Sequence, residues 1–314
     1  MRHGNRQNHG KACRAMLVCG CDIYTRTAGA STRPRATTSL HLSSLRITTG
    51  QALNHTMCQL LGLNCKNPTD ATFSFSGFAQ RAGVTDHHAD GWGIAFFEGS
   101  EQDRGLRHFI DHLPASTSPV AELIRKYPIK SRNVISHIRK ATQGEVALEN
   151  CHPFVRELWG RYWVFAHNGN LENFAPRLHG NFKPVGHTDS EYAFCWLMQE
   201  LAKSHANVPS VDELTLTLRE LVPQIAKHGT FNFLLSNGQA LWAHASTNLC
   251  YVERKHPFAK ATLSDQDMSI NFAEHASPDD RVAVVVTAPL TTNEAWTPFA
   301  PGELKVFVDG QLRA

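Results

Sequence analysis

The residues best suited to chemistry in this sequence begin with a cysteine far from its written start. Cys58 follows Met57 and leads into the largely apolar run Gln59–Leu63. A cysteine with a free α-amino group combines a thiol nucleophile and an amine base on one residue, which is a recognised way to activate a weak nucleophile. By residue type alone, Cys58 is more often an ordinary buried cysteine entering a strand. The residues downstream must decide between these two interpretations.

Four short polar runs follow, each at the predicted end of a strand or start of a helix. They are His137-Ile-Arg139-Lys-Ala-Thr142-Gln-Gly144, Asn150-Cys-His152-Pro153, His167-Asn168-Gly169 and His187-Thr188-Asp189-Ser-Glu191. Loops that follow strands are where a scaffold commonly presents binding and catalytic residues. These runs therefore form the candidate site.

Amide hydrolysis by a cysteine requires a base for the thiol, donors for the developing oxyanion, and partners for the charged ends of the substrate. Taken alone, each run also has a simpler explanation. Asn168-Gly169 is typical of a tight turn, Arg139 of a surface ion pair, and Asp189 of a helix cap. Thr188 and Glu191 have the spacing of a capping box, which favours a helix start at this point.

Taken together, and in this order and spacing, the runs resemble the motifs of the class II glutamine amidotransferases, which are N-terminal nucleophile hydrolases. The resemblance is to the small single-domain, YafJ-type members in particular. It extends from Met57 through the run Ala288–Trp296 towards the C-terminus. Two positions depart from the pattern of the family: Gln143 stands where sugar-phosphate-forming members have a histidine, and Lys140 where an aromatic residue is usual.

The resemblance implies a role for each matching residue. Cys58 would attack the side-chain amide carbon of glutamine and form a γ-glutamyl thioester that water cleaves, releasing glutamate and ammonia. Asn168 and Gly169 would form the oxyanion hole. Arg139, with Thr142 beside it, would hold the substrate α-carboxylate, and Asp189 would hold the α-ammonium group.

Three histidines, His137, His152 and His167, lie within the motifs and could converge on a metal ion. No carboxylate or cysteine accompanies them at ligand spacing, and the resemblance implies neither a metal nor another cofactor. We therefore expect these histidines to orient loops or to line the pocket.

The order of predicted elements indicates an α+β fold. Strands come first, two helices over 187–204 and 211–228 lie in the middle, and strands close the chain, with an Asn237-Gly238 hairpin between two of them. A parallel sheet would require regular alternation of strands and helices. Stacked, mainly antiparallel sheets with flanking helices fit better, and the resemblance implies the four-layer αββα sandwich of N-terminal nucleophile hydrolases.

Composition divides the chain at Cys58. Residues 1–57 contain eight Lys or Arg and one acid, whereas residues 58–314 contain 23 basic and 27 acidic residues. We expect a disordered basic leader over 1–57, explained by an upstream mis-start, a removable propeptide or a transit peptide, and one amidotransferase domain over 58–314. The domain lacks the basic stripe of a nucleic-acid-binding protein and the ~18-residue apolar run of a membrane helix. Scattered cysteines without CxxC spacing favour a reduced, cytoplasmic protein.

Three functions remain open. The 257 residues from Cys58 to Ala314 are all assigned to the glutaminase unit, so released ammonia would pass to a separate partner protein or be lost to solution. The alternative substrate is another small γ-glutamyl metabolite, cleaved by the same chemistry. If residues 1–57 are retained, Cys58 has no free amine, and the protein would be a non-catalytic regulatory or binding module.

Overall fold

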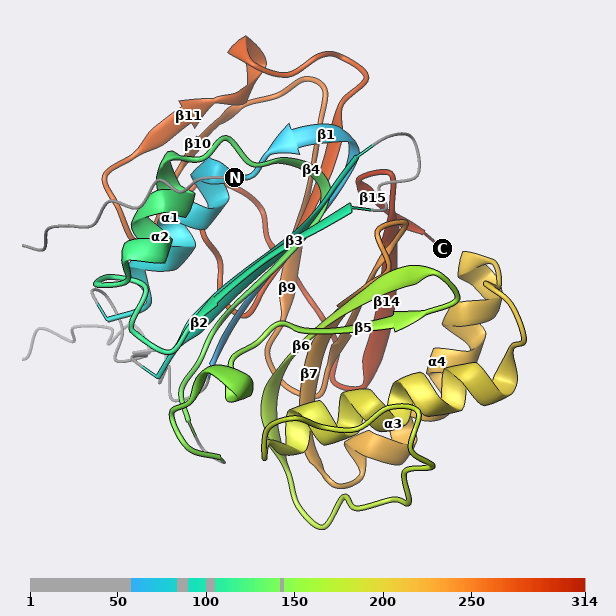
Figure 1. The fold of residues 1–314 in the computed structure, drawn as a ribbon. Coiled ribbons are helices and arrows are strands. Elements are labelled where there is room, and N and C mark those ends of the chain that lie inside the picture. Colours follow the sequence, from blue (N-terminus) through green and yellow to red (C-terminus); the bar gives the residue numbers. More distant parts are fainter. Residues whose placement is uncertain (1–57, 84–89, 100–104, 142–143, 314) are drawn as a thin grey trace, which may run out of the picture. The chain divides into compact units, whose positions relative to one another are not determined.

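The computed structural model describes residues 58–83, 90–99, 105–141 and 144–313 of the chain. The predicted basic leader, residues 1–57, lies outside these described residues, and so does Thr142. The described residues form two antiparallel sheets, each covered on its outer side by helices (Figure 1). The α+β class predicted from the order of the elements is therefore confirmed.

The first sheet has β1 at its centre, and its neighbouring strands come from distant parts of the chain. Its spatial order is β13 (Thr297–Pro298), β9 (Cys250–Lys255), β12 (Arg281–Val286), β1 (Gln59–Asp70), β4 (Lys130–Ile138), β2 (Trp92–Glu98) and β3 (Gly105–Asp111). The pairing of β1 with β4 places Gln59 opposite Ile138. The start of β1 and the end of β4 are therefore adjacent.

The second sheet carries the remaining long strands. Its order is β15 (Gln311–Arg313), β14 (Glu303–Val308), β8 (Leu241–Ala245), β7 (Gly229–Ser236), β6 (Arg161–Leu171) and β5 (Phe154–Leu158). A separate ribbon pairs β10 (Lys260–Thr262) with β11 (Ser269–Asn271). The helices are α1 (Thr72–Gln80), α2 (Pro119–Lys126), α3 (Asp189–Ser204) and α4 (Val211–Ala226), with short 3₁₀ turns η1 (Leu148–Asn150) and η2 (Phe272–Glu274).

Buried apolar side chains of the described residues form three clusters, which fix the order of the layers. One lies between α1, α2 and the first sheet, a second between the two sheets, and a third between the second sheet and α3 and α4. Figure 1 shows α1 and α2 on one outer side and α3 and α4 on the other. The four-layer αββα sandwich of the N-terminal nucleophile hydrolases is confirmed.

The sequence of β1 explains its central position. Successive side chains on a strand point to opposite faces. Leu61 packs towards the helices, whereas Leu60 packs towards the second sheet. A Cβ atom on Gly62 would come within 3.0 Å of two leucines of the second sheet, so glycine here lets the sheets approach closely. Both faces of the strand are buried, which accounts for its unbroken apolar run.

Local signals located the two long helices well. Thr188 caps α3 by accepting a hydrogen bond from the Glu191 amide at 3.2 Å. The capping box is incomplete because the Glu191 carboxylate accepts from the amides of Val185 and Gly186 instead of returning to the cap. The predicted hairpin at Asn237-Gly238 joins β7 to β8, as expected.

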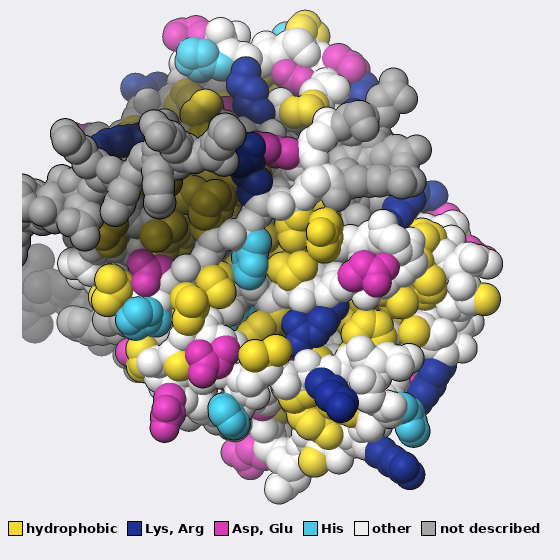
Figure 2. Space-filling view, in the orientation of Figure 1, with side chains coloured by type: hydrophobic (Ala, Val, Ile, Leu, Met, Phe, Trp, Pro, Cys, Tyr) yellow, Lys and Arg dark blue, Asp and Glu magenta, His cyan; other side chains and the backbone are white. Residues whose placement is uncertain are grey.

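Charged side chains of both signs are interspersed with apolar ones on the coloured part of the face in Figure 2. Among the helices of the described residues, none is both long and apolar enough to cross a membrane.

Candidate active site

Cys58 lies at the start of the central strand, beside the end of β4. Its thiol donates a hydrogen bond to the Lys140 carbonyl at 3.2 Å, and its sulfur accepts one from the Lys140 amide at 3.1 Å. Both contacts involve only the backbone of Lys140. The Lys140 side chain takes no part in them.

The environment of the sulfur keeps it protonated near neutral pH. Cys58 is partly exposed, yet the protein atoms packed around its sulfur bury it enough to raise the thiol pKa from 9.0 to about 11. The Lys140 amide and the positive charge of Arg139 oppose this rise, and the Asp90 carboxylate adds to it. A thiol with this pKa is a poor nucleophile at pH 7 unless a base accepts its proton.

Arg139 follows β4 directly, and backbone carbonyls fix its guanidinium group. The group donates to the carbonyls of Gly144 and Glu145, each at 3.1 Å, and to that of Asp90 at 3.4 Å. The side chain is almost fully buried. The simpler reading of Arg139 as a surface ion pair therefore does not describe its environment.

Asp90 is a site residue that the sequence motifs did not identify. Its carboxylate accepts a hydrogen bond from the Ala141 amide at 2.8 Å, while its own amide donates to the Arg139 carbonyl at 3.3 Å. Consecutive amides after Arg139 thus bind the Cys58 sulfur and the Asp90 carboxylate. The only feature of the sequence that points to Asp90 is its position before Gly91 at the start of β2. An Asp-Gly pair is also common at ordinary turns, so it does not identify a site residue.

Asn168 reaches the nucleophile from the opposite sheet. It lies on β6, is fully buried, and donates through Nδ2 to the backbone carbonyl of Cys58. The same nitrogen lies 3.4 Å from the Thr287 hydroxyl, which also accepts from the Leu60 amide at 2.9 Å. Its Oδ1 atom has no hydrogen-bond partner within the described residues. The structure therefore brings Cys58 and Asn168 together.

Gly169 occupies a position that only glycine can fill. A Cβ atom there would lie 1.8 Å from the carbonyl oxygen of Thr230 on β7 and 2.7 Å from Nε2 of His167. The first distance is far below a normal contact, and the atom in the way belongs to the backbone. Close pairing of β6 with β7 thus explains why glycine follows Asn168.

Asn232, on β7 directly opposite Asn168, holds the backbone of Asn168 in place. Its Nδ2 donates to the Asn168 carbonyl at 3.1 Å, and its Oδ1 accepts from the amides of Ser246 and Thr247 at 2.9 Å. The sequence does not indicate this role, because a single asparagine in an apolar strand matches no recognisable local motif.

We expect Asn232→Ala to lower the free energy of unfolding by about 2–4 kcal/mol, because buried amide and carbonyl groups lose their partners. The control is Asn207→Ala, since Asn207 is exposed in the loop between α3 and α4. Urea denaturation of the two variants beside the parent protein measures the difference. Equal unfolding midpoints for the two variants would contradict the assigned role.

Asp189 is the first residue of α3 and ties that helix to the end of β6. Its Oδ2 atom accepts a hydrogen bond from the Leu171 amide at 2.7 Å, and its Oδ1 atom lies 3.3 Å from the Ser190 hydroxyl. Thr188, not Asp189, caps the helix. The carboxylate is partly exposed and lies at the C-terminal end of the strand that carries Asn168 and Gly169.

The three histidines divide between two layers. The rings of His137 and His152 lie against each other at a tilt of 42°, with centroids 4.2 Å apart. His167 instead bonds through Nδ1 to the Ser190 hydroxyl at 2.8 Å and through Nε2 to the Thr230 carbonyl at 3.0 Å. Burial lowers the pKa of His152 well below its usual value, with a further contribution from His137, and burial also lowers the pKa of His167. Through its two hydrogen bonds, the His167 ring links β7 to the start of α3.

Comparisons with known proteins identify the family of this chain. The family model of the class-II glutamine amidotransferases matches residues 57–314. A protein of Haemophilus influenzae named "Putative glutamine amidotransferase" is 52% identical over 255 residues, which cover 81% of this chain and 85% of that protein. "Putative glutamine amidotransferase YafJ" of Escherichia coli is 48% identical over 256 residues, covering 81% and 99%.

A solved structure, "predicted glutamine amidotransferase from Pseudomonas aeruginosa PA01", is similar with a TM-score of 0.66 and 40% identity, covering 82% of this chain and all of that one. The family match spans more than half of the chain and includes every motif of the candidate site. The chain therefore belongs to the class II glutamine amidotransferases, whose general chemistry is hydrolysis of the glutamine side-chain amide and transfer of the ammonia.

Proposed function

We propose that this protein, once its chain begins at Cys58, hydrolyses the side-chain amide of glutamine through a γ-glutamyl thioester. The observation that carries the proposal is the meeting of Cys58 and Asn168 from opposite sheets, with Arg139 beside the sulfur. A nucleophile, an oxyanion donor and a carboxylate-binding cation then surround one point. This is the set of groups that cleavage of a glutamyl amide requires.

The free α-amine of Cys58 is the proposed base. It accepts the thiol proton as the sulfur attacks the amide carbon, and it delivers that proton to the departing nitrogen, which leaves as ammonia. Water then cleaves the thioester and releases glutamate. The raised pKa of the thiol makes such a base necessary, because few thiolates are present at pH 7 without one.

Asn168 and Gly169 are proposed to stabilise the oxyanion. The Nδ2 group of Asn168 carries two hydrogens, one directed at the Cys58 carbonyl and the other making only a long contact with Thr287. The second hydrogen is the one that a negatively charged substrate oxygen next to the sulfur would attract. The backbone amide of Gly169 is the proposed second donor.

Arg139 and Asp189 are proposed to bind the α-carboxylate and α-ammonium groups of the glutamyl substrate, with Thr142 beside the carboxylate. The three carbonyls that hold the Arg139 guanidinium fix its plane before substrate arrives. A planar, preoriented guanidinium suits a carboxylate. Asp189 is partly exposed, so its charge is accessible to an ammonium group.

Replacement of Arg139 by glutamine should raise KM for glutamine about 10- to 100-fold, the effect expected from loss of one charged hydrogen-bonded contact. The same variant should lose its preference for glutamine over 4-aminobutanamide, which lacks the α-carboxylate. Steady-state kinetics with both amides measure the two effects. If Arg139 only braces its loop, both substrates will lose activity by the same factor.

The experiment that tests the function compares two forms of the protein, the chain from Met1 and the chain from Cys58, each with its N-terminus verified by intact mass. Glutamate release should appear with the second form and be absent from the first. A panel of γ-glutamyl amides assayed beside glutamine then identifies the substrate class. Activity that does not depend on a free Cys58 amine would refute the proposed mechanism.

Ammonia released at this site is proposed to pass to a separate acceptor protein. The described residues form one αββα sandwich, and none of them is assigned to acceptor chemistry, so the proposed acceptor is a second protein. Affinity capture with the Cys58→Ala protein, followed by assays of ammonia-dependent synthesis with each captured enzyme, tests this partner. Free ammonia formed at the full rate with every candidate present would instead favour simple hydrolysis.

A further inference from the structure

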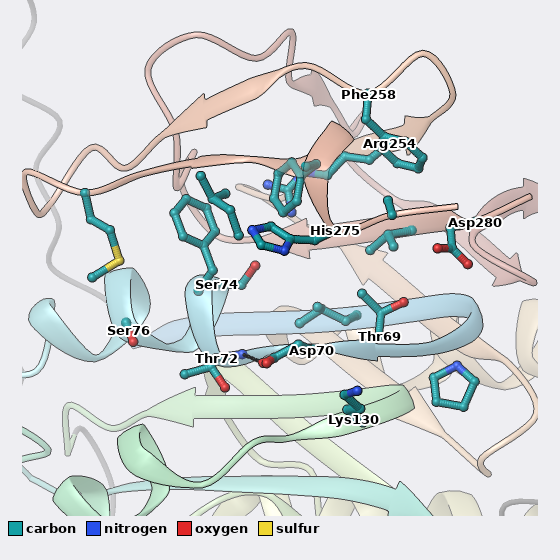
Figure 3. A pocket seen from close by; sticks show the side chains of 18 of the residues that line it. Thr69, Asp70, Thr72, Ser74, Ser76, Lys130, Arg254, Phe258, His275 and Asp280 are labelled. Atoms are coloured by element: carbon teal, nitrogen blue, oxygen red, sulfur yellow. Dashed lines mark hydrogen bonds between the residues drawn. The ribbon is translucent and has the colours of Figure 1, made fainter. Parts of the chain in front are cut away.

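A pocket of about 680 Å³ lies at the opposite end of β1 from Cys58 (Figure 3). Its walls come from the end of β1, the start of α1, β9, β11 and η2. Of the described residues that line it, none belongs to the proposed glutamine site. Its volume is within the range of pockets that bind small organic molecules.

One wall of the pocket is aromatic. The ring of Phe73 on α1 meets that of Phe272 edge to face, with centroids 5.7 Å apart, and Phe258 also lines the pocket. Met268 and Ile270 also line the pocket beside these rings. Met268 is 36% exposed and belongs to none of the three apolar clusters. A flat apolar group would fit against these side chains.

Two residues with little exposed surface, Ser74 and Arg254, present hydrogen-bond donors to the pocket. Ser74 is 3% exposed, its side chain points from the first turn of α1 into the pocket (Figure 3), and its hydroxyl makes no hydrogen bond with a described residue. Arg254 is also buried, and Glu294 binds its Nε and Nη2 atoms at 2.7 Å each. Its Nη1 atom has no hydrogen-bond partner in the described part of the chain. The Phe272 ring lies against the Arg254 guanidinium group, with the ring centroid 4.6 Å from the guanidinium carbon Cζ.

Charged side chains of both signs line the pocket, and Lys130 lies opposite Asp70 where β1 pairs with β4. Arg125 and Lys130 line it without forming an ion pair with any described residue. The acids that line it already accept hydrogen bonds: Asp70 from the Thr72 amide at 2.7 Å, and Asp280 from Asn67 and the Ser277 amide at 2.8 and 2.7 Å. The Ser74 hydroxyl, the Arg254 Nη1 atom and the cations of Arg125 and Lys130 are therefore the groups left to bond the acceptor atoms of a ligand.

We propose that this pocket is a second ligand site, which binds a small organic anion with a flat aromatic body. The body lies against Phe73, Phe258 and Phe272, and its acceptor atoms bond to Ser74 and Arg254. The negative group lies at the exposed side, next to Lys130 and Arg125. This site is separate from the glutamine site and does not depend on the proposed reaction.

The probe for this site is 8-anilinonaphthalene-1-sulfonate, an aromatic monoanion whose fluorescence rises on binding. The matched neutral probe is N-phenyl-1-naphthylamine, which has the same rings without the sulfonate. With the full chain, the anionic probe should bind at one saturable site. The Lys130→Glu variant should weaken it about tenfold, because a nearby charge is reversed, while affinity for the neutral probe stays the same.

Three controls make the result specific. Phe258→Ala should weaken both probes, and Lys203→Glu, an exposed charge reversal on α3, should change neither. The chain from Cys58, labelled at that residue by 6-diazo-5-oxonorleucine, should bind the anionic probe as the unlabelled chain does. Unfolding midpoints confirm that the variants are folded. The proposal is overturned if Lys130→Glu and Phe258→Ala leave both affinities unchanged, if the two probes respond equally to Lys130→Glu, or if labelling at Cys58 prevents binding.

Discussion

Cys58→Ala is expected to abolish glutamate release from glutamine in the chain that begins at residue 58, because no other group can form the thioester. The glutamine analogue 6-diazo-5-oxonorleucine should label the parent protein once, at Cys58, and should not label the variant. Cys65→Ala is the matched control, since Cys65 lies on the same strand but is buried in the core between that sheet and the helices. Peptide mapping by mass spectrometry locates the label. Labelling at another cysteine would remove Cys58 from the proposed role.

The chain that begins at Cys58 also allows a test of the base. Burial raises the pKa of the Cys58 thiol to about 11, so the thiol stays protonated throughout the neutral range. The α-amino group ordinarily titrates at a pKa of about 7.7–8.0. If the neutral amine is the base, kcat/KM should be low below that pKa and should rise as the pH passes through it. A profile that first rises near pH 11 would instead mean that the thiolate forms without the amine.

Asn168→Ala should lower kcat for glutamine hydrolysis by about 10²- to 10³-fold, the usual effect of removing one oxyanion donor. KM should change little, because this hydrogen bond strengthens only as negative charge develops on the substrate oxygen. Steady-state kinetics on the chain from Cys58 separate the two constants. Asn168→Asp should be at least as impaired, since a carboxylate next to the oxyanion repels it.

A control for Asn168 is needed because its amide also bonds to the Cys58 carbonyl and so orders the nucleophile. Thr287→Val removes the hydroxyl group that the Asn168 amide also contacts, and it leaves the amide itself in place. It should lose far less activity than Asn168→Ala. If both variants lose activity equally, with a rise in KM and a lower unfolding midpoint, Asn168 acts on structure and not on the transition state.

Much of the fold and the candidate site could be predicted from local patterns. The helices α3 and α4 begin at residues whose caps are visible in the sequence, and the Asn237-Gly238 turn identifies its hairpin. Two motifs lie where the local patterns placed them, at the end of β4 and at the start of α3. The prediction that His167, Asn168 and Gly169 follow the end of a strand was wrong, because β6 continues to Leu171 and pairs with β7 through all three residues. Family membership followed from the order and spacing of these motifs.

The tertiary structure decided which of these residues meet. His167 and Asn168 are neighbours in the sequence, but the alternation of side chains on β6 sends one to α3 and the other across to Cys58. Asp90, Asn232 and Thr287 join the site only because their strands pair with, or stack on, strands far away in the chain. No local pattern encodes such pairing. The sequence by itself determined the kinds of group this protein has for amide chemistry; the stacking of the two sheets, driven by burial of the apolar faces between them, determined that the groups converge.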